Sequence, residues 1–378
     1  MSRNHPAARL LSTDVSTPRR PLAKLLAAAL LCALVLGAVG AAGAASAGAG
    51  ETAGAGTHRA GGARASSARR GRAARHAKGA HRARVASYLS GLGDEQATMF
   101  ANPLWKQLKT KIVRYVVPYD AVAHSWSLDQ AIDFIRAAEA AHQQVLVAFY
   151  HSEYSPTRLP SVPAYKRDVQ RFIKLFPHVR QYESWDESNR GNEPPLFTSP
   201  SAVQAAKYYQ ALIRVCRRCT VVGLDVLDAY YIQPTLRYIA EFKREIYRLE
   251  TVMPKVWGLH NYSDVNRLEG WRTTDLVRAL GGKVWLTETG GIVKFGGSFP
   301  NKHGSGLRRS AKVLKFMFKV AGEHPQIKRI YIYDWNGGTA STRFDAGLTN
   351  AREQPREGYV VVCRRLRGAR CGVKVARN

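Results

Sequence analysis

The stretch Gln181-Tyr-Glu-Ser-Trp-Asp-Glu-Ser-Asn189 begins as a short run of strand-forming residues and ends in adjacent carboxylates, followed directly by the loop Arg190-Gly-Asn-Glu-Pro-Pro195. A second run, Val284-Trp-Leu-Thr-Glu-Thr-Gly290, also leads from hydrophobic strand residues to an acid and a turn. Glu187 and Glu288 therefore each stand where a predicted strand meets a loop. Because loops held by a rigid scaffold often carry functional residues, we interpret the rest of the chain as the scaffold for this pair.

Short β-branched or aromatic runs alternate with helical hydrophobic patterns on both sides of these stretches. The predicted strands are residues 85–89, 111–117, 144–150, 179–185, 220–224, 256–260, 284–288 and 329–334. The predicted helices are residues 97–108, 127–141, 164–176, 200–218, 235–249, 274–280, 307–321 and 359–367. This alternation predicts an α/β fold, a (β/α)8 TIM barrel, which takes about 250 residues. A doubly wound open sheet is the alternative, but it lacks support because no glycine-rich phosphate loop follows the first strand.

The chain divides into three predicted segments. Residues 1–47 resemble a secretory signal peptide, with basic residues, an uncharged Leu- and Ala-rich run and the small-residue site Ala45-Ser46-Ala47. An uncleaved membrane anchor is the alternative, although the run loses its large apolar residues after Val39, short of the roughly 20 that a span needs. Residues 48–84, rich in Ala, Gly and Arg, are predicted to be a disordered linker. Residues 85–378 form the predicted barrel domain.

The charge and the cysteines fit an exported protein. Residues 1–84 hold 14 of the 57 basic and two of the 28 acidic residues, so +17 of the net charge of +29 belongs to the rest of the chain. Anionic cell-envelope polymers suit the basic linker of an exported protein better than nucleic acid does. Two disulfides would use the four cysteines beyond Cys32, with three pairings possible; we favour local pairing over a redox CxxC or a zinc site. The four are Cys216, Cys219, Cys363 and Cys371.

Polar residues gather at the predicted strand ends, which converge on one face of a barrel. They are Arg114, Asp120, His151, Glu153, Asp186, Glu187, Asn189, Asp225, His260, Tyr262, Glu288, Asp334 and Trp335. This pattern favours an enzyme over an inert barrel. A metal at Asp120, His151 and Glu153 is the alternative, but no regular spacing links them. We therefore predict no metal and no cofactor.

At these residues the chain resembles the clan A glycoside hydrolases. Glu183-Ser-Trp-Asp-Glu-Ser-Asn189 is similar to their strand-four Asn-Glu motif, and Trp285-Leu-Thr-Glu-Thr-Gly290 to their strand-seven nucleophile motif. The resemblance covers residues 85–335 and implies that Glu187 is the general acid/base and Glu288 the nucleophile. It further implies that Arg114 and Tyr262 hold the nucleophile ionised and oriented, and that Trp335 forms an aromatic floor under the sugar. Asp186 and His260 are additional predicted substrate contacts.

Glycoside hydrolysis requires one carboxyl to be protonated near neutral pH while its partner stays ionised. We expect Arg114 to favour the charged form of Glu288, and Asp186 to raise the pKa of Glu187. The clan usually has Asn at the position of Asp186, where it donates a hydrogen bond to the sugar 2-hydroxyl. The resemblance implies retention, with the carboxyls about 5 to 5.5 Å apart.

The sequence thus predicts a monomeric glycoside hydrolase, secreted or associated with the cell envelope, that cleaves a β-linked polysaccharide or glycan with two glutamates. Its predicted partner is the carbohydrate substrate, and it would meet the membrane only through an uncleaved signal. Two alternatives are a catalytically inactive carbohydrate-binding barrel and an envelope-tethered adhesion protein whose basic arm is the functional part.

Overall fold

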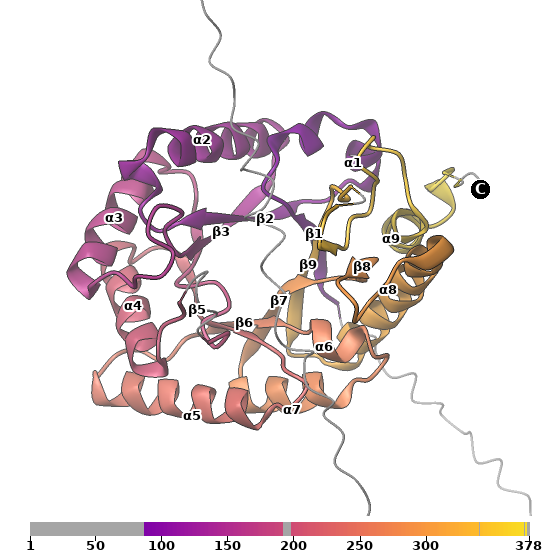
Figure 1. The fold of residues 1–378 in the computed structure, drawn as a ribbon. Helices are drawn as coiled ribbons and strands as arrows, with labels where there is room; N and C mark the ends of the chain where they lie inside the picture. The colour runs from indigo at the N-terminus through magenta and orange to yellow at the C-terminus, as the bar shows by residue number, and fades with distance from the viewer. Residues whose placement is uncertain (1–86, 192–197, 340, 374, 376–378) are drawn as a thin grey trace, which may run out of the picture. The chain divides into compact units, whose positions relative to one another are not determined.

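A computed structural model describes residues 87–191, 198–339, 341–373 and 375, which form a closed barrel of eight parallel strands in the order β1-β2-β3-β4-β5-β6-β7-β9 (Figure 1). The barrel closes where β9 pairs with β1, from Leu89 opposite Arg329 to Gly93 opposite Tyr333. The predicted (β/α)8 fold is therefore confirmed. Its strands are β1 Leu89–Gly93, β2 Ile112–Pro118, β3 Gln144–Tyr150, β4 Gln181–Glu183, β5 Thr220–Leu227, β6 Val256–His260, β7 Lys283–Thr289 and β9 Ile327–Tyr333.

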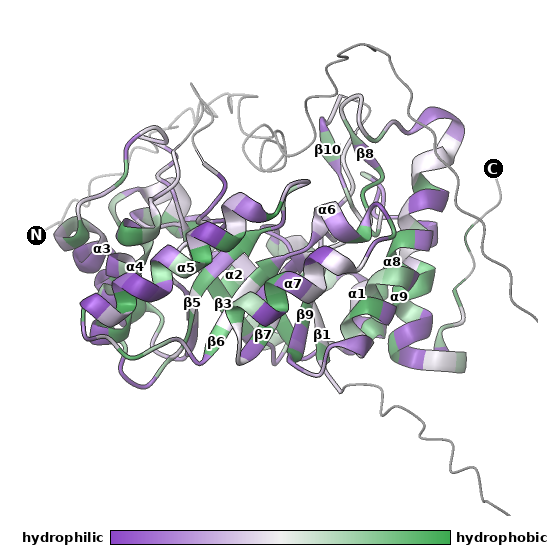
Figure 2. Cartoon of the chain, turned by 90° about the horizontal axis from the view of Figure 1, so that it is seen from below, coloured by the Kyte–Doolittle hydropathy of each residue, from purple (hydrophilic) through white to green (hydrophobic). Residues whose placement is uncertain are grey.

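Helices surround the barrel (Figure 1). Figure 2 shows the strands largely hydrophobic and the helices banded, which fits helices that bury one face against the sheet and expose the other to water. The helices are α1 Pro103–Leu108, α2 Ser125–Ala140, α3 Val162–Leu175, α4 Ala202–Val215, α5 Gln233–Arg248, α6 Tyr262–Val265, α7 Trp271–Leu280, α8 Ser305–Glu323 and α9 Glu357–Arg367.

The interior of the barrel is filled in layers, as is usual for this fold. A buried apolar layer consists of Ile112, Leu146, Val222, Val256, Trp285 and Tyr331. Below it, at the N-terminal ends of the strands, Arg329 donates hydrogen bonds to Gln181 (2.6 Å) and Gln144 (3.3 Å), and its guanidinium lies 4.0 Å from the Trp285 ring centroid. These contacts seal the base, so the charged residues above face only the opposite end.

Two predictions near the start of the domain were wrong in detail. The first strand, β1, begins at Leu89, where the predicted strand 85–89 was expected to end; residues 85 and 86 lie outside the described residues. The glycines of β1 serve close packing, since a Cβ at Gly91 would lie 1.9 Å from the carbonyl oxygen of Ile112. The helix expected at 97–108 is divided at Asn102, whose side chain accepts from the N–H of Leu104 and caps α1.

A two-stranded antiparallel sheet, which the sequence did not predict, is formed by β8 (Lys294–Phe295) and β10 (Phe344–Asp345). It stands at one end of the barrel (Figure 2). Phe295 and Phe344 belong to a second buried cluster with Tyr262 and Tyr333, so this sheet packs beside the C-terminal ends of β6 and β9.

Disulfides join Cys216 to Cys219 and Cys363 to Cys371, which is the local pairing. Among the residues that the structure describes, no helix has the length and apolarity needed to cross a bilayer. The predicted signal peptide (residues 1–47) and linker (48–84) lie outside the described residues.

Candidate active site

The structure brings together the predicted site residues, with the exception of Trp335. Most of them stand at or just beyond the C-terminal ends of the strands, whereas Arg114 is the third residue of β2. Arg114 comes from β2, Asp186 and Glu187 follow β4, and His260 and Tyr262 lie at the end of β6. Glu288 belongs to β7 and completes the group. All of these side chains are buried, so the site is a dense set of charges within the mouth of the barrel.

Arg114 is the centre of the set. Its guanidinium donates to Glu183 (3.0 Å), to Asp186 and to Glu288 (3.3 Å), and lies 4.0 Å from Asp225. Arg114 can satisfy several carboxylates at once because the planar guanidinium carries five N–H donors. Burial nevertheless raises the pKa of Glu183 and of Asp186, against the lowering effect of Arg114. The guanidinium therefore compensates the acids only in part.

His260 lies between the two predicted catalytic glutamates. Its Nδ1 is 3.0 Å from Oε1 of Glu187 and 3.3 Å from Oε2 of Glu288, and its Nε2 is 2.9 Å from Oδ2 of Asp225. Burial lowers the pKa of His260, but the charges of Asp225 and Glu288 outweigh it and hold this pKa well above the usual range. These carboxylates thus favour the protonated form of His260, whose Nδ1 faces both glutamates.

Glu187 occupies a tight turn after β4. Its φ of 43° lies in the left-handed region, which is uncommon for a residue with a side chain. Arg190, three residues later, donates to Oε2 of Glu187 at 3.1 Å, while His260 contacts the other oxygen. Both carboxyl oxygens of Glu187 are therefore held in place.

Glu288 accepts two hydrogen bonds in addition to its contact with His260. The hydroxyl of Tyr262 donates to Oε1 at 3.1 Å, and Arg114 donates to Oε2 at 3.3 Å. Burial raises the pKa of Glu288 to about 7, although His260 and Arg114 lower it. The expected contact with Arg114 is present, but the net shift of the pKa is opposite to the one that Arg114 alone would produce.

Trp335 lies outside this group. Its ring is fully buried in the main core and meets Tyr359 of α9 edge-on, with the ring centroids 6.0 Å apart. The strand β9 ends at Tyr333, earlier than the sequence suggested, and it is Tyr333 that turns toward the site. The hydroxyl of Tyr333 donates to Oε2 of Glu95 at 3.3 Å, and the ring packs in the cluster that contains Tyr262.

Several members of the site were not singled out as site residues from the sequence: Glu183, Arg190, Glu95 and Tyr333. Glu183 carried a usable signal, because an acid inside a strand of a closed barrel must face either the interior or the hydrophobic helix layer. Arg190 and Glu95 are loop residues in no recognisable pattern. Asp225 was recognised only as a polar strand end.

The acids are also close enough together to be considered as metal ligands. Atoms of Glu183, Asp186, Asp225 and His260 lie within 4.8 Å of one another, and so do atoms of Glu187, His260 and Glu288. In the first group, however, the guanidinium of Arg114 already contacts all three acids. Arg114 therefore already supplies a positive charge to the acids of the first group.

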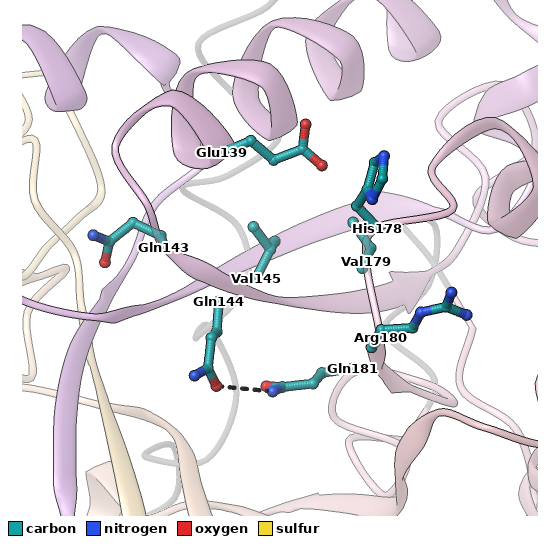
Figure 3. A pocket seen from close by; sticks show the side chains of 8 residues that line it. All are labelled: Glu139, Gln143, Gln144, Val145, His178, Val179, Arg180 and Gln181. Atoms are coloured by element: carbon teal, nitrogen blue, oxygen red, sulfur yellow. Dashed lines mark hydrogen bonds between the residues drawn. The ribbon is translucent and has the colours of Figure 1, made fainter.

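A cavity of about 540 Å³ opens at the other end of the barrel (Figure 3). It is lined by side chains around the first residues of β3 and β4, including Gln144 and Gln181, which hydrogen-bond to each other at 3.1 Å. It belongs to the base of the barrel and is separated from Glu187 and Glu288 by the apolar layer.

No protein-family model matches the sequence, and no curated protein matches it. Several solved structures, however, match the fold of this chain. A psychrophilic family 10 endo-β-1,4-xylanase superimposes with a TM-score of 0.56 at 12% identity, covering 73% of this chain and 96% of the xylanase. Fungal β-1,4-galactanases match with a TM-score of 0.53 at 12% identity, over 74% and 100%. The chain has the fold of glycoside hydrolases. A further match is a GH5_18 protein from Bifidobacterium longum in complex with Manβ1-4GlcNAc, with a TM-score of 0.53 at 11% identity over 76% and 80%.

Arg114→Gln should lower the free energy of unfolding at pH 7 by about 3–5 kcal/mol, because it leaves buried carboxylates without their cation. Without Arg114 the acids take up protons more readily in the folded state, so lowering the pH to 5 should recover part of this loss. Urea unfolding of the wild type and the variant at pH 7 and pH 5 measures the difference in the free energy of unfolding. The control Arg278→Gln removes an exposed ion pair with Asp275 and should cost less than about 1 kcal/mol. Equal losses in the two variants would contradict the central role of Arg114.

Proposed function

We propose that this protein is a retaining glycoside hydrolase with Glu187 as general acid/base and Glu288 as nucleophile. The observation that carries the proposal is the pair itself: two buried glutamates at the ends of β4 and β7, with one oxygen of each within 4.8 Å of the other. Retaining enzymes have carboxyls about 5–5.5 Å apart, whereas inverting enzymes need about 6.5–9.5 Å to admit a water. The shared fold with glycoside hydrolases supports the same reaction class.

In the first step, Glu288 attacks the anomeric carbon while Glu187 gives its proton to the departing glycosidic oxygen. In the second step, Glu187 takes a proton from water, which attacks the same carbon and releases Glu288. The contacts of Glu288 with Tyr262 and Arg114 suit a nucleophile, because both donors stabilise its ionised form and aim its oxygens. Asp186 is itself held by Arg114 and is proposed to contact the sugar together with His260 and Tyr333.

Exposed aromatic side chains support a polymeric substrate. In the described part of the chain, four of the five large aromatic side chains found exposed stand at the catalytic end of the barrel: Tyr154, Tyr230 and Tyr231 on loops, and Trp271 at the first residue of α7. Asp228 ties the loop of Tyr230 and Tyr231 to the site, since its carboxylate accepts from the N–H groups of Ser263 and Asp264, directly after Tyr262. Flat rings bind the apolar faces of sugars, so this rim, defined as these four residues, suits a chain of several units.

The two disulfides support export, because disulfides persist in oxidising compartments. We propose that the protein is secreted or retained at the cell envelope, where the basic residues of 48–84 would contact anionic polymers. The substrate class proposed is a β-linked polysaccharide or glycan, and the protein is proposed to act as a monomer without a cofactor.

Release of reducing ends should be measured across β-glucans, xylans, mannans, galactans and cell-wall glycans. We expect hydrolysis of at least one polymer, and we expect Glu187→Gln and Glu288→Gln each to reduce it by orders of magnitude, since the isosteric amide can neither donate the proton nor attack. Glu139→Gln, at the exposed base of the barrel, should retain full activity. Saturable glycan binding by the wild type with no cleavage would favour the inactive binding barrel instead.

The rate should fall on the acid side of neutrality. Glu288 must be ionised to attack, and its pKa is about 7. The value of kcat/KM for a chromogenic glycoside should therefore drop about tenfold per pH unit below pH 7. Circular dichroism at each pH would separate this limb from unfolding. A plateau that continues to pH 5 would contradict the assignment of Glu288 as nucleophile.

Tyr231→Ala and Trp271→Ala should each lower kcat/KM for the polymer about tenfold, which corresponds to roughly 1.4 kcal/mol. Neither variant should affect a chromogenic monosaccharide glycoside of the same sugar, because that substrate does not reach the rim. The matched control is Tyr247→Ala, which removes an 84% exposed ring from α5 and should change neither rate. Equal losses on polymer and glycoside would argue against a polymer-binding rim.

A further inference from the structure

Asp225 contacts one proposed catalytic residue, Glu187, and the chain neighbour of the other, Glu288. Its Oδ2 accepts a hydrogen bond from the backbone N–H of Glu187 at 3.2 Å and lies 2.9 Å from Nε2 of His260. Its Oδ1 accepts from the hydroxyl of Thr287, the residue before Glu288. Asp225 is itself fully buried and has no direct contact with either catalytic carboxyl in the described structure. Its influence on them must pass through its neighbours.

An irregularity in β5 turns Asp225 toward the site. Val222 faces the barrel interior, whereas Leu224 and Val226 pack in the outer core. A Cβ at Gly223 would also point outward, 2.2 Å from Pro254. Two successive residues therefore face outward, and the pairing of β5 with β6 shifts register between Val222 and Asp225. In a regular strand Asp225 would face the helix layer, so this bulge aims an acid into the site.

The neighbouring strand leaves room for the carboxylate. Gly258 of β6 pairs with Asp225, and a Cβ at this position would lie 2.1 Å from Oδ1 of Asp225. Only glycine at position 258 fits the observed position of the carboxylate. Two separate features, the bulge in β5 and the glycine in β6, thus serve the same side chain.

The catalytic turn depends on Asp225 for its backbone contacts. Glu187 has a left-handed φ of 43°, a conformation that is unfavourable for a residue with a side chain. Its N–H donates to the Asp225 carboxylate, and the next N–H, of Ser188, donates to the Asp225 carbonyl at 3.0 Å. Two consecutive amides of the turn are therefore bound to one residue.

His260 is the second route to the catalytic pair. It is faced by ionisable groups from three directions: Asp186 and Glu187 after β4, Asp225 on β5 and Glu288 on β7. Of these acids Asp225 lies closest to Nε2, at 2.9 Å against 3.8 Å for Asp186, whereas Nδ1 faces Glu187 and Glu288. The charge on Asp225 also favours the imidazolium over the neutral ring.

We propose that Asp225 is a positioning residue of this site, which holds the turn of Glu187 through its backbone and keeps His260 charged and oriented between the two catalytic glutamates. This inference rests on the proposed function. It assigns a task to a side chain that need not touch the substrate.

Asp225→Asn tests the charge alone. The amide oxygen can face the Glu187 N–H and His260, while the amide nitrogen can face the Thr287 hydroxyl, so the shape is preserved. On the hydrolysed substrate we expect kcat to fall about 10- to 100-fold with KM within about twofold, and the alkaline limb of the pH profile to move down by about one unit or more. The matched control is Asp168→Asn, which alters a buried aspartate of α3 that binds Arg167. It should change neither kcat nor the alkaline limb of the pH profile.

The pKa of His260, followed by NMR of the imidazole and assigned with His260→Gln, gives a readout that needs no activity. It should fall by about one unit or more in Asp225→Asn and stay constant in Asp168→Asn. An unchanged His260 pKa, or a wild-type kcat with a wild-type pH profile, overturns the proposal. If no glycan is hydrolysed by the wild type, the proposed function fails, while the NMR result still decides whether Asp225 controls His260.

Discussion

A buried guanidinium among carboxylates is the constraint on which the upper half of this barrel depends. Removing a charge from water costs several kcal/mol, and only well-placed opposite charges offset that cost. Arg114 must therefore have Glu183, Asp186 and Glu288 around it, and these acids in turn need Arg114. Because they come from different strands, the strands must keep their relative register for the charges to balance. The same interaction that disfavours unfolding thus also sets the spacing of the chemistry.

The alternation of strands and helices could be predicted from the sequence because it follows from local patterns. Strand β3 and strand β6 have the predicted bounds, since apolar runs bounded by polar residues leave little choice. The pairing of Glu187 with Glu288 was also within reach, because barrel topology brings strand ends together wherever they lie in the sequence.

What could not be predicted depends on departures from regular geometry. The role of Asp225 requires the bulge in β5, and a bulge leaves little trace in a run of apolar residues. Trp335 and Tyr333 differ by two positions, and the end of β9 decides which of them turns toward the glutamates. The pKa of Glu288 depends on the balance between burial and its charged neighbours. Each of these features comes from tertiary contacts rather than from the local sequence.

The position of β1 has a consequence for how the protein is presented to its surroundings. Leu89 begins β1 at the sealed base, and Tyr88 just before it bonds to the carbonyl of Phe318 on α8 and accepts from Arg365 on α9. Everything N-terminal to this point is joined to the chain at the end remote from Glu187 and Glu288. An attachment made at Ser87, the first described residue, would therefore start on the side of the barrel opposite to the two glutamates.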